Sequence, residues 1–139
     1  MLDIEQIKRI IPHRPPFLLL TRVSEIGEDY ARGEWDLTGD EDFFKGHFPG
    51  NKILPGVLMI ESMAQLGSII MLSREEYRGR TPIFGGIKNA RFKAMAVPPV
   101  KLTLETRITK SRGSLGFGAG KIFVDGDVAC SAEMSYYIK

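Results

Sequence analysis

Apolar residues follow two distinct patterns along the chain. In the C-terminal half they alternate with polar residues, as in Val100, Leu102 and Leu104, and this period of two is typical of half-buried β-strands. From residue 56 to residue 72 they are nearly continuous instead. Such a segment places apolar side chains almost all round a helix, so the sequence predicts one long helix that is covered on most of its sides.

The other elements follow from the same patterns and from turn residues. Residues 3–11 show helical spacing with Asp3 as the expected N-cap, and the prolines of the next segment prevent the helix from continuing. Asp125 and Gly126 mark a tight hairpin between the last two strands. In total the sequence predicts about six strands, at residues 17–26, 30–37, 82–92, 100–108, 115–124 and 127–138.

These elements fit a single α+β domain over residues 1–139. Most of the strands are consecutive, which favours antiparallel pairing, and a curved antiparallel sheet wrapped around the long central helix would bury that helix. This arrangement is called a hotdog fold. One sheet of this size covers only part of such an apolar helix, so we also expect a second subunit.

Three polar residues interrupt the apolar helix. Glu61, Gln65 and Ser68 are spaced at i, i+4 and i+7, which places them on one face. One interpretation is the solvent-exposed face of an amphipathic helix. The stripe is narrow, however, and contains no Lys or Arg in a chain that has 19 of them, so a stripe that lines a cavity is the alternative.

The residues around this helix include a candidate acid, base and oxyanion donor. Apolar neighbours should remove solvation from the charged form of Glu61 and raise its pKa, which makes it a candidate general acid. His47 lies in a long loop over residues 38–55, and histidine side chains ordinarily titrate near neutral pH, so it is the candidate base. Gly56 begins the helix, where free N–H groups stabilise negative charge on an oxygen. Together they suit proton abstraction beside a carbonyl, followed by loss of a hydroxyl.

Composition narrows the setting. The single cysteine, Cys130, excludes an internal disulfide and fits a reducing compartment, and no signal pattern or apolar run of about 18 residues is present, so we expect a cytoplasmic protein without membrane insertion. The formal net charge of +2 divides unequally, with −4 over residues 1–70 and +6 over residues 71–139. The basic half predicts either the wet face of antiparallel strands or an acidic partner.

Other kinds of site are disfavoured. Two histidines without a cysteine cluster make a zinc site improbable, so we expect no metal. His13 has no acid near it in the sequence and is interpreted as structural. The aromatic residues do not interleave with a basic stripe, which argues against stacking on nucleic acid.

Four segments then carry a resemblance to a known family. "PHRPPFLLLTRV", "GHFPG", "PGVLMIESMAQ" and "VDGDVACSAEM" are similar, in this order, to motifs of the FabZ-type 3-hydroxyacyl-[acyl-carrier-protein] dehydratases, and the resemblance runs from about residue 4 to residue 136. Glu61 follows His47 by fourteen residues, as this pattern requires. A glutamate rather than an aspartate at this position favours the FabZ type over its isomerising relative FabA.

The resemblance implies a lyase of fatty acid biosynthesis. Its substrate would be a (3R)-hydroxyacyl thioester on acyl carrier protein, and its products a trans-2-enoyl thioester and water. His47 would take the C2 proton, Glu61 would assist departure of the 3-hydroxyl, and the N–H of Gly56 would hold the thioester carbonyl. In the family the histidine of one subunit faces the acid of its dimer partner, three dimers often form a hexamer, and no cofactor is needed.

The resemblance also extends to supporting residues. Gln65, one turn after Glu61, would orient that carboxylate. The apolar helix would line an acyl tunnel, with further tunnel or rim residues expected at Phe48, Pro49, Val57 and Met95. The phosphopantetheine arm and the acidic carrier need a basic landing zone, for which the candidates are Lys88, Arg91 and Lys93.

Departures and alternatives remain at this stage. The chain has Thr21 where an aspartate is common, "AVPPVKL" at residues 96–102 where "VVPGDxL" is usual, and Phe117 where a tryptophan is frequent. These leave chain-length preference open. The competing functions are a hotdog acyl thioesterase, a dehydratase that also shifts the double bond from trans-2 to cis-3, and a non-catalytic subunit that binds the acyl carrier.

Overall fold

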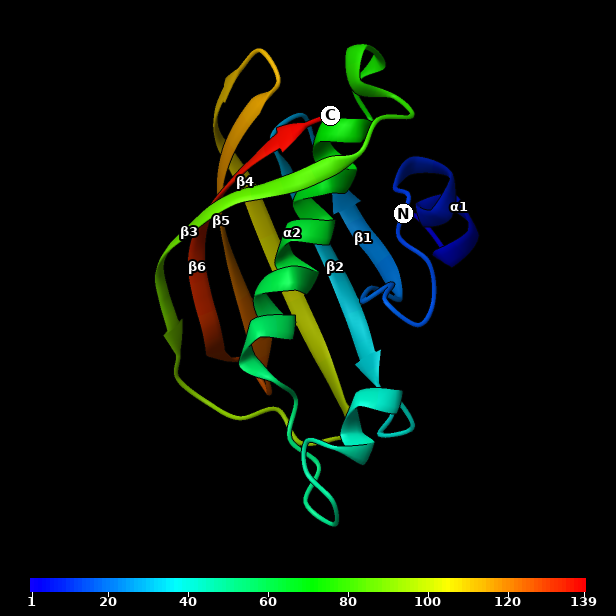
Figure 1. Ribbon diagram of the computed structural model, residues 1–139, viewed down its shortest axis with the longest axis vertical. Coiled ribbons are helices and arrows are strands. Elements are labelled where there is room, and N and C mark those ends of the chain that lie inside the picture. Colours follow the sequence, from blue (N-terminus) through cyan, green and yellow to red (C-terminus); the bar gives the residue numbers. More distant parts are fainter.

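The computed structural model describes all 139 residues. One six-stranded sheet forms the body of the molecule, in the order β1-β2-β4-β5-β6-β3, and every neighbouring pair is antiparallel. Figure 1 shows this sheet curving around α2, which lies against one of its faces. The strands are β1 (Arg22–Ile26), β2 (Tyr30–Leu37), β3 (Pro82–Phe92), β4 (Val100–Arg112), β5 (Leu115–Val124) and β6 (Asp127–Ile138).

Two α-helices accompany the sheet. The short α1 (Ile4–Ile10) begins with a capping box, in which Asp3 accepts from the backbone of Gln6 and the Gln6 side chain accepts in return from the backbone of Asp3. It lies outside β1 (Figure 1). The long α2 (Gly56–Leu72) provides much of the core, and two 3₁₀ turns, η1 (Asp42–Lys45) and η2 (Glu75–Tyr77), flank it in the chain.

The central helix is buried against the inner face of the sheet. Twelve of its residues are buried, because inward-facing residues of β2, β4 and β6 cover the apolar stripe. Thr106 of β4, itself buried, donates from its hydroxyl to the backbone carbonyl of Met63 at 3.0 Å, which ties the helix to the sheet. The predicted hotdog arrangement of one sheet around one long helix is therefore confirmed.

The predicted elements differ from the structure in three places. The first strand was expected from residue 17, but it begins at Arg22, because residues 17–19 bind a side chain of α2 instead of a neighbouring strand. The fourth strand continues to Arg112 rather than ending at residue 108. Sequential neighbours do not always pair, since β3 crosses over to β6 and becomes an edge of the sheet.

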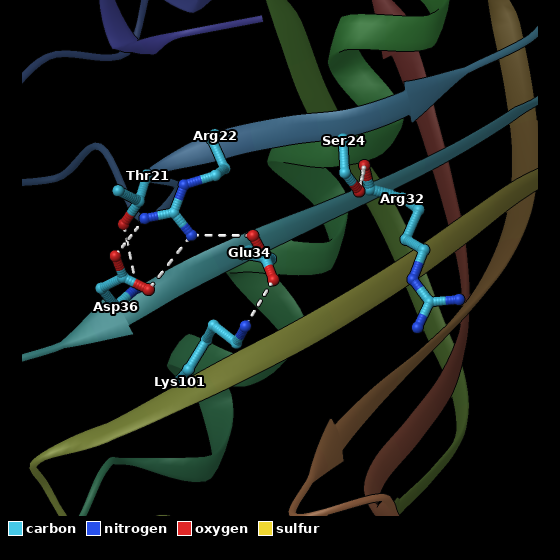
Figure 2. A network of polar contacts seen from close by, with 7 residues as sticks. All are labelled: Thr21, Arg22, Ser24, Arg32, Glu34, Asp36 and Lys101. Carbon is cyan, nitrogen blue, oxygen red and sulfur yellow. Dashed lines mark hydrogen bonds and ion pairs between the residues drawn. The ribbon is translucent and has the colours of Figure 1, made fainter. Parts of the chain in front are cut away.

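A charged network covers the outer face of β1, β2 and β4. Figure 2 shows Arg22 between Glu34 and Asp36, while Lys101 reaches the second carboxylate oxygen of Glu34 at 3.0 Å. Thr21, the residue that departs from the family pattern, accepts a hydrogen bond from the backbone N–H of Asp36 at 2.9 Å. Position 21 therefore keeps a local contact in this chain.

No helix in the structure combines the length and the apolar character needed to cross a lipid bilayer.

Candidate active site

Glu61 lies on α2 with its side chain 18 % exposed. Burial disfavours the charged carboxylate and raises the pKa of Glu61, while a hydrogen bond from Gln65 acts in the opposite direction with a smaller effect. The carboxyl group therefore binds its proton more strongly than an exposed glutamate does. This is the property that a general acid near neutral pH requires.

Gln65 connects Glu61 to the N-terminal segment. Its amide nitrogen donates to the Glu61 carboxylate at 3.0 Å and to the carbonyl of Phe17 at 2.9 Å. Its amide oxygen accepts from the N–H of Leu19 at 2.8 Å. Because Gln65 is fully buried and all of these partners are close, the orientation of its amide is determined, and the Glu61 oxygen that it contacts is held with it.

The polar stripe of α2 does not face solvent. Gln65 is 0 % and Ser68 is 5 % exposed, so the interpretation of an amphipathic solvent face is wrong. Glu61 and Ser68 line a cavity of about 30 Å³ together with residues of β3, β6 and the segment after α1. The full lining is His13, Glu61, Ala64, Ser68, Pro82, Ile83, Phe84 and Tyr136.

His47 is held by the loop in which it was predicted to lie. Its Nδ1 is 2.8 Å from the carbonyl oxygen of Ile53, and its ring stacks on Phe48 with centroids 4.0 Å apart. A carbonyl can only accept, so Nδ1 carries the proton in the neutral ring and donates it to Ile53. The remaining nitrogen, Nε2, is then unprotonated and able to act as a base.

Gly56 begins α2 at a point of close approach. A Cβ atom at this position would lie 2.7 and 2.8 Å from two ring atoms of Phe92, so a larger residue requires the ring to move. The preceding Pro55 offers no side-chain cap, and the first turn of the helix contains no acidic residue. The N–H groups of this turn, which have no partners inside the helix, can therefore hold an oxygen that gains negative charge.

The structure brings some of the expected residues together and separates others. Glu61 and Gln65 are in contact, whereas His47 is not among the residues that line the cavity beside Glu61. The expected tunnel residues are exposed at the surface of the single chain, with Val57 71 % and Met95 66 % exposed. The expected docking residues Lys88, Arg91 and Lys93 are exposed on or just after the edge strand β3.

Two residues near Glu61 were missed from the sequence. His13 was interpreted as structural, but its Nε2 lies 3.8 Å from Oε2 of Glu61. Tyr136 lies on the inner face of β6 and lines the same cavity. Both approach Glu61 only through the tertiary fold, because they are 48 and 75 positions away from it in the sequence. The alternation of buried residues in the last strand was the only signal that pointed to Tyr136.

A larger cleft lies elsewhere on the surface. The largest cleft, about 690 Å³, lies between the β1–β2 hairpin and the C-terminal end of α2, and its lining is mostly polar. Arg74 bridges this cleft through contacts with Asp29 and Ser111, which is a structural role. No group of three or more His, Cys, Asp or Glu side chains is placed to hold a metal ion.

Comparison with known proteins gives sequence relatives over the full chain. The chain is 50 % identical over 137 residues to the 3-hydroxyacyl-[acyl-carrier-protein] dehydratase FabZ of Bacillus velezensis. The alignment covers 98 % of this chain and 97 % of the relative. The protein of the same name from Bacillus subtilis is 48 % identical, with the same coverage. That from Clostridium perfringens is 47 % identical over 138 residues, covering 99 % of both chains.

Solved structures with little sequence identity share the fold. The dehydratase heterocomplex ApeI:P from Xenorhabdus doucetiae superposes with a TM-score of 0.82 at 20 % identity, over 96 % of this chain and 90 % of the other. A mutant thioesterase from Pseudomonas aeruginosa gives a TM-score of 0.71 at 16 % identity, over 98 % and 93 %. A family model described as a FabA-like domain matches residues 11–133. This chain therefore belongs to the family of FabA-like domains.

Proposed function

We propose that this protein is a 3-hydroxyacyl-[acyl-carrier-protein] dehydratase of fatty acid biosynthesis, a lyase that converts (3R)-hydroxyacyl thioesters to trans-2-enoyl thioesters and water. The observation that carries the proposal is the partly buried carboxyl of Glu61, whose pKa is raised by burial and which Gln65 holds in place. Relatives of about half-identical sequence and matching length carry the same name. The cytoplasm, where fatty acid precursors and reduced thiols occur together, is the proposed location.

The two candidate catalytic side chains divide the reaction between them. The Nε2 atom of His47 takes the proton from C2 of the substrate, and the carbonyl oxygen, held by the N–H of Gly56, accepts the electron pair as an enolate. As the enolate collapses, the bond between C3 and the hydroxyl breaks. The carboxyl of Glu61 donates its proton to the departing oxygen, which leaves as water. No metal or organic cofactor takes part in these steps.

A second copy of the chain completes the site. His47 and Glu61 do not meet within one chain, and the edge strand β3 has exposed backbone and apolar side chains available for pairing. We infer a homodimer in which His47 of one subunit faces Glu61 of the other, with three dimers forming a hexamer. The exposed tunnel candidates Phe48, Pro49, Val57 and Met95 would then be covered and line the acyl channel.

The partner is an acidic acyl carrier protein. Lys88, Arg91 and Lys93 are exposed along β3 and just beyond it, near the same edge of the sheet. Positive charge at the mouth of the channel would attract the acidic carrier and orient its phosphopantetheine arm toward the interior.

The departures from the family pattern lie away from these steps. Phe117 is on the outer face of β5 and partly exposed. Ala96, in the altered segment 96–102, is buried, and its carbonyl accepts from the N–H of Leu54 at 3.0 Å, so the segment still supports the loop before α2.

Hydration of a crotonyl thioester, the reverse reaction, tests the proposal. The purified protein should consume the enoyl absorbance, and His47→Ala or Glu61→Gln should reduce the rate by about 10²–10⁴-fold, as expected for loss of a general base or acid. Glu75→Gln, which alters a glutamate in the η2 turn, is the matched control and should keep the wild-type rate.

Three outcomes would contradict the proposal. An inert wild-type protein, on carrier-bound substrate as well, would remove the dehydratase function. Release of free thiol would indicate thioesterase chemistry. Full activity in Glu61→Gln would remove Glu61 from its proposed role as the acid.

A further inference from the structure

Two buried polar atoms near Glu61 have no hydrogen-bonding partner within the chain. They are Nδ1 of His13 and the hydroxyl oxygen of Tyr136, and they are the only buried side-chain nitrogen and oxygen atoms in this condition. An unpaired buried polar group destabilises the fold, because it has lost its hydrogen bonds to water without gaining others. Both atoms belong to residues that line the 30 Å³ cavity beside Glu61.

The position of Tyr136 is built into the sheet. Its side chain is 5 % exposed and lies over Gly116 of β5, where a Cβ atom would approach the ring to 2.8 Å. A residue larger than glycine at position 116 would push the ring away. The absence of a side chain there allows the tyrosine to extend toward α2, where Ser68 lines the same cavity.

The cavity has the size and the polar lining of a hydration site. A buried water needs about 10–15 Å³ and two to four polar partners, and the volume of about 30 Å³ exceeds this requirement. Ser68 donates its hydroxyl hydrogen to the carbonyl of Ala64 at 2.8 Å, which leaves the Ser68 oxygen free to accept. Tyr136, His13 and Ser68 can therefore supply one donor and two acceptors to a single water molecule.

We propose that one water molecule bridges Tyr136, His13 and Ser68, and that this bridge holds His13 in the tautomer that presents Nε2–H to Glu61. The water accepts from the Tyr136 hydroxyl and donates to Nδ1 of His13 and to the Ser68 oxygen. A neutral imidazole that accepts at Nδ1 carries its proton on Nε2. His13 and Tyr136 are thus positioning residues for the general acid.

The geometry fits a contact that tightens during the reaction. Nε2 of His13 is 3.8 Å from Oε2 of Glu61, which is too long for a hydrogen bond in the resting chain. When Glu61 gives its proton to the departing hydroxyl, it becomes a carboxylate and attracts the Nε2–H group more strongly. Catalytic hydrogen bonds are often long in free enzymes and shorten in the reacting complex.

Burial and one nearby charge favour a neutral His13. Burial lowers the pKa of His13, and the adjacent Arg14 lowers it further. Burial also raises the pKa of Tyr136, with a smaller opposite effect of Arg74, so the phenol keeps its proton. Both shifts favour the neutral forms of His13 and Tyr136, which are the forms that the water bridge requires.

Tyr136→Phe tests this inference, which rests on the proposed dehydratase function. The variant removes one hydroxyl and keeps the ring on Gly116. We expect kcat to fall by about tenfold, the size of one lost hydrogen bond, with KM unchanged. Without the bridge His13 donates less to the carboxylate, so the pKa of Glu61 rises. The alkaline limb of the pH–rate profile, measured in the dehydration direction where Glu61 must carry its proton, moves to higher pH. Ser68→Ala should show a smaller change in the same direction.

Tyr137→Phe is the matched control. It removes the same hydroxyl from the next residue of β6, which points to the outer face and is 41 % exposed, and it should leave kcat and the pH profile unchanged. A crystal structure of the wild type should contain a water within hydrogen-bonding distance of Tyr136 and His13, and this water should be absent or displaced in Tyr136→Phe.

The results separate the inference from the proposed function. A wild-type pH profile and kcat in Tyr136→Phe would overturn the inference, while the rates of the wild type and of Glu61→Gln would still test the dehydratase. A lower kcat with an unmoved alkaline limb would mean that Tyr136 has only a packing role, and this result would also overturn the inference. An empty cavity in the wild type would remove the bridge, and a wild type without hydratase activity would overturn both proposals.

Discussion

At the scale of the single residue, the placement of Glu61 lowers the stability of the fold at neutral pH and suits the proposed chemistry. Burial raises the pKa of its carboxyl, which suits the proposed role of protonating a leaving hydroxyl. The same burial disfavours the ionised form at neutral pH. Residues selected for activity are often unfavourable for stability in this way.

Glu61→Gln should therefore be more stable than the wild type at pH 8. Because the folded state raises the pKa of Glu61, its contribution to stability is fully present below the ordinary value of 4.5 and is lost as the pH rises through the raised value. Glutamine removes this loss, and its amide oxygen can still accept from Gln65. Thermal unfolding followed by circular dichroism between pH 4 and pH 8 should show a gap that closes toward pH 4. Equal stability at pH 8 would contradict this expectation.

Gly56→Ala tests the close approach at the start of α2. The added methyl would meet the Phe92 ring at 2.7 Å, so we expect a loss of about 1–3 kcal/mol in the free energy of unfolding, together with reduced hydratase activity. Gly46→Ala is the control, since its φ of −115° is open to any residue and no atom lies within 4 Å of the added methyl. Urea titration measures the free energy of unfolding of both variants, and the hydration assay measures their activity. A Gly56→Ala protein with wild-type stability and activity would show that the ring moves freely.

Residue-scale prediction from sequence worked where spacing within one helix decides the outcome. The separation of four positions between Glu61 and Gln65 was enough to predict that their side chains share a face, and the structure has them hydrogen-bonded. The contact of Glu61 with His13 depends on how the segment after α1 crosses the helix. Helical spacing contains no information on that crossing, so the sequence left His13 without a partner.

At the scale of the elements, periodicity predicted most of the fold. The bounds of β2, β3, β5, β6 and α2 agree with those expected from alternating and continuous apolar segments. The strand pairing was harder to predict. A pattern of buried residues indicates which face of a strand is buried, but it does not indicate which strand lies beside it in the sheet. The crossover of β3 to β6 creates the free edge of the sheet, and pairing between consecutive strands would not have predicted it.

Glu34→Gln tests the ion network that joins β1, β2 and β4. Arg22, followed by Lys101, lowers the pKa of Glu34, so its stabilising contribution is present above the ordinary value of 4.5 and is lost as the pH falls through the lowered value. We expect the variant to lose about 0.5–1 kcal/mol at pH 7, since the network is partly exposed, and the difference to vanish in acid. Urea unfolding at a series of pH values from 7 to well below 4.5 provides the measurement. Glu28→Gln in the hairpin serves as control, and a loss that does not shrink as the pH falls below 4.5 would exclude the ionic explanation.

At the scale of the whole molecule, the separation of His47 from Glu61 makes the proposed activity a property of the assembly. In the proposed dimer each chain contributes a base to one site and an acid to the other. The sequence indicated this only through the family resemblance and through a helix too apolar for one sheet to cover. Periodicity within a single chain cannot locate a surface that a second chain supplies.

Mixing two inactive variants tests the shared site. His47→Ala and Glu61→Gln chains, unfolded together and refolded in equal amounts, should recover about one quarter of the wild-type activity, because half of the dimers are mixed and each mixed dimer has one intact site. Each variant refolded alone is the control and should stay inactive. Absence of recovery, in a preparation where mass spectrometry detects mixed dimers, would place both residues in the same chain's site.

The attachment of residues 17–19 to α2 has a consequence for how the protein can change over generations. Gln65 recognises this segment through the peptide groups of Phe17 and Leu19 and not through their side chains. Phe17, which is 51 % exposed, is therefore free to drift while the attachment persists. Position 65 has no such freedom, because a shorter amide could not span both peptide groups and Glu61 at once. Among descendants of this chain, the recognising residue should stay constant while the segment that it recognises diverges.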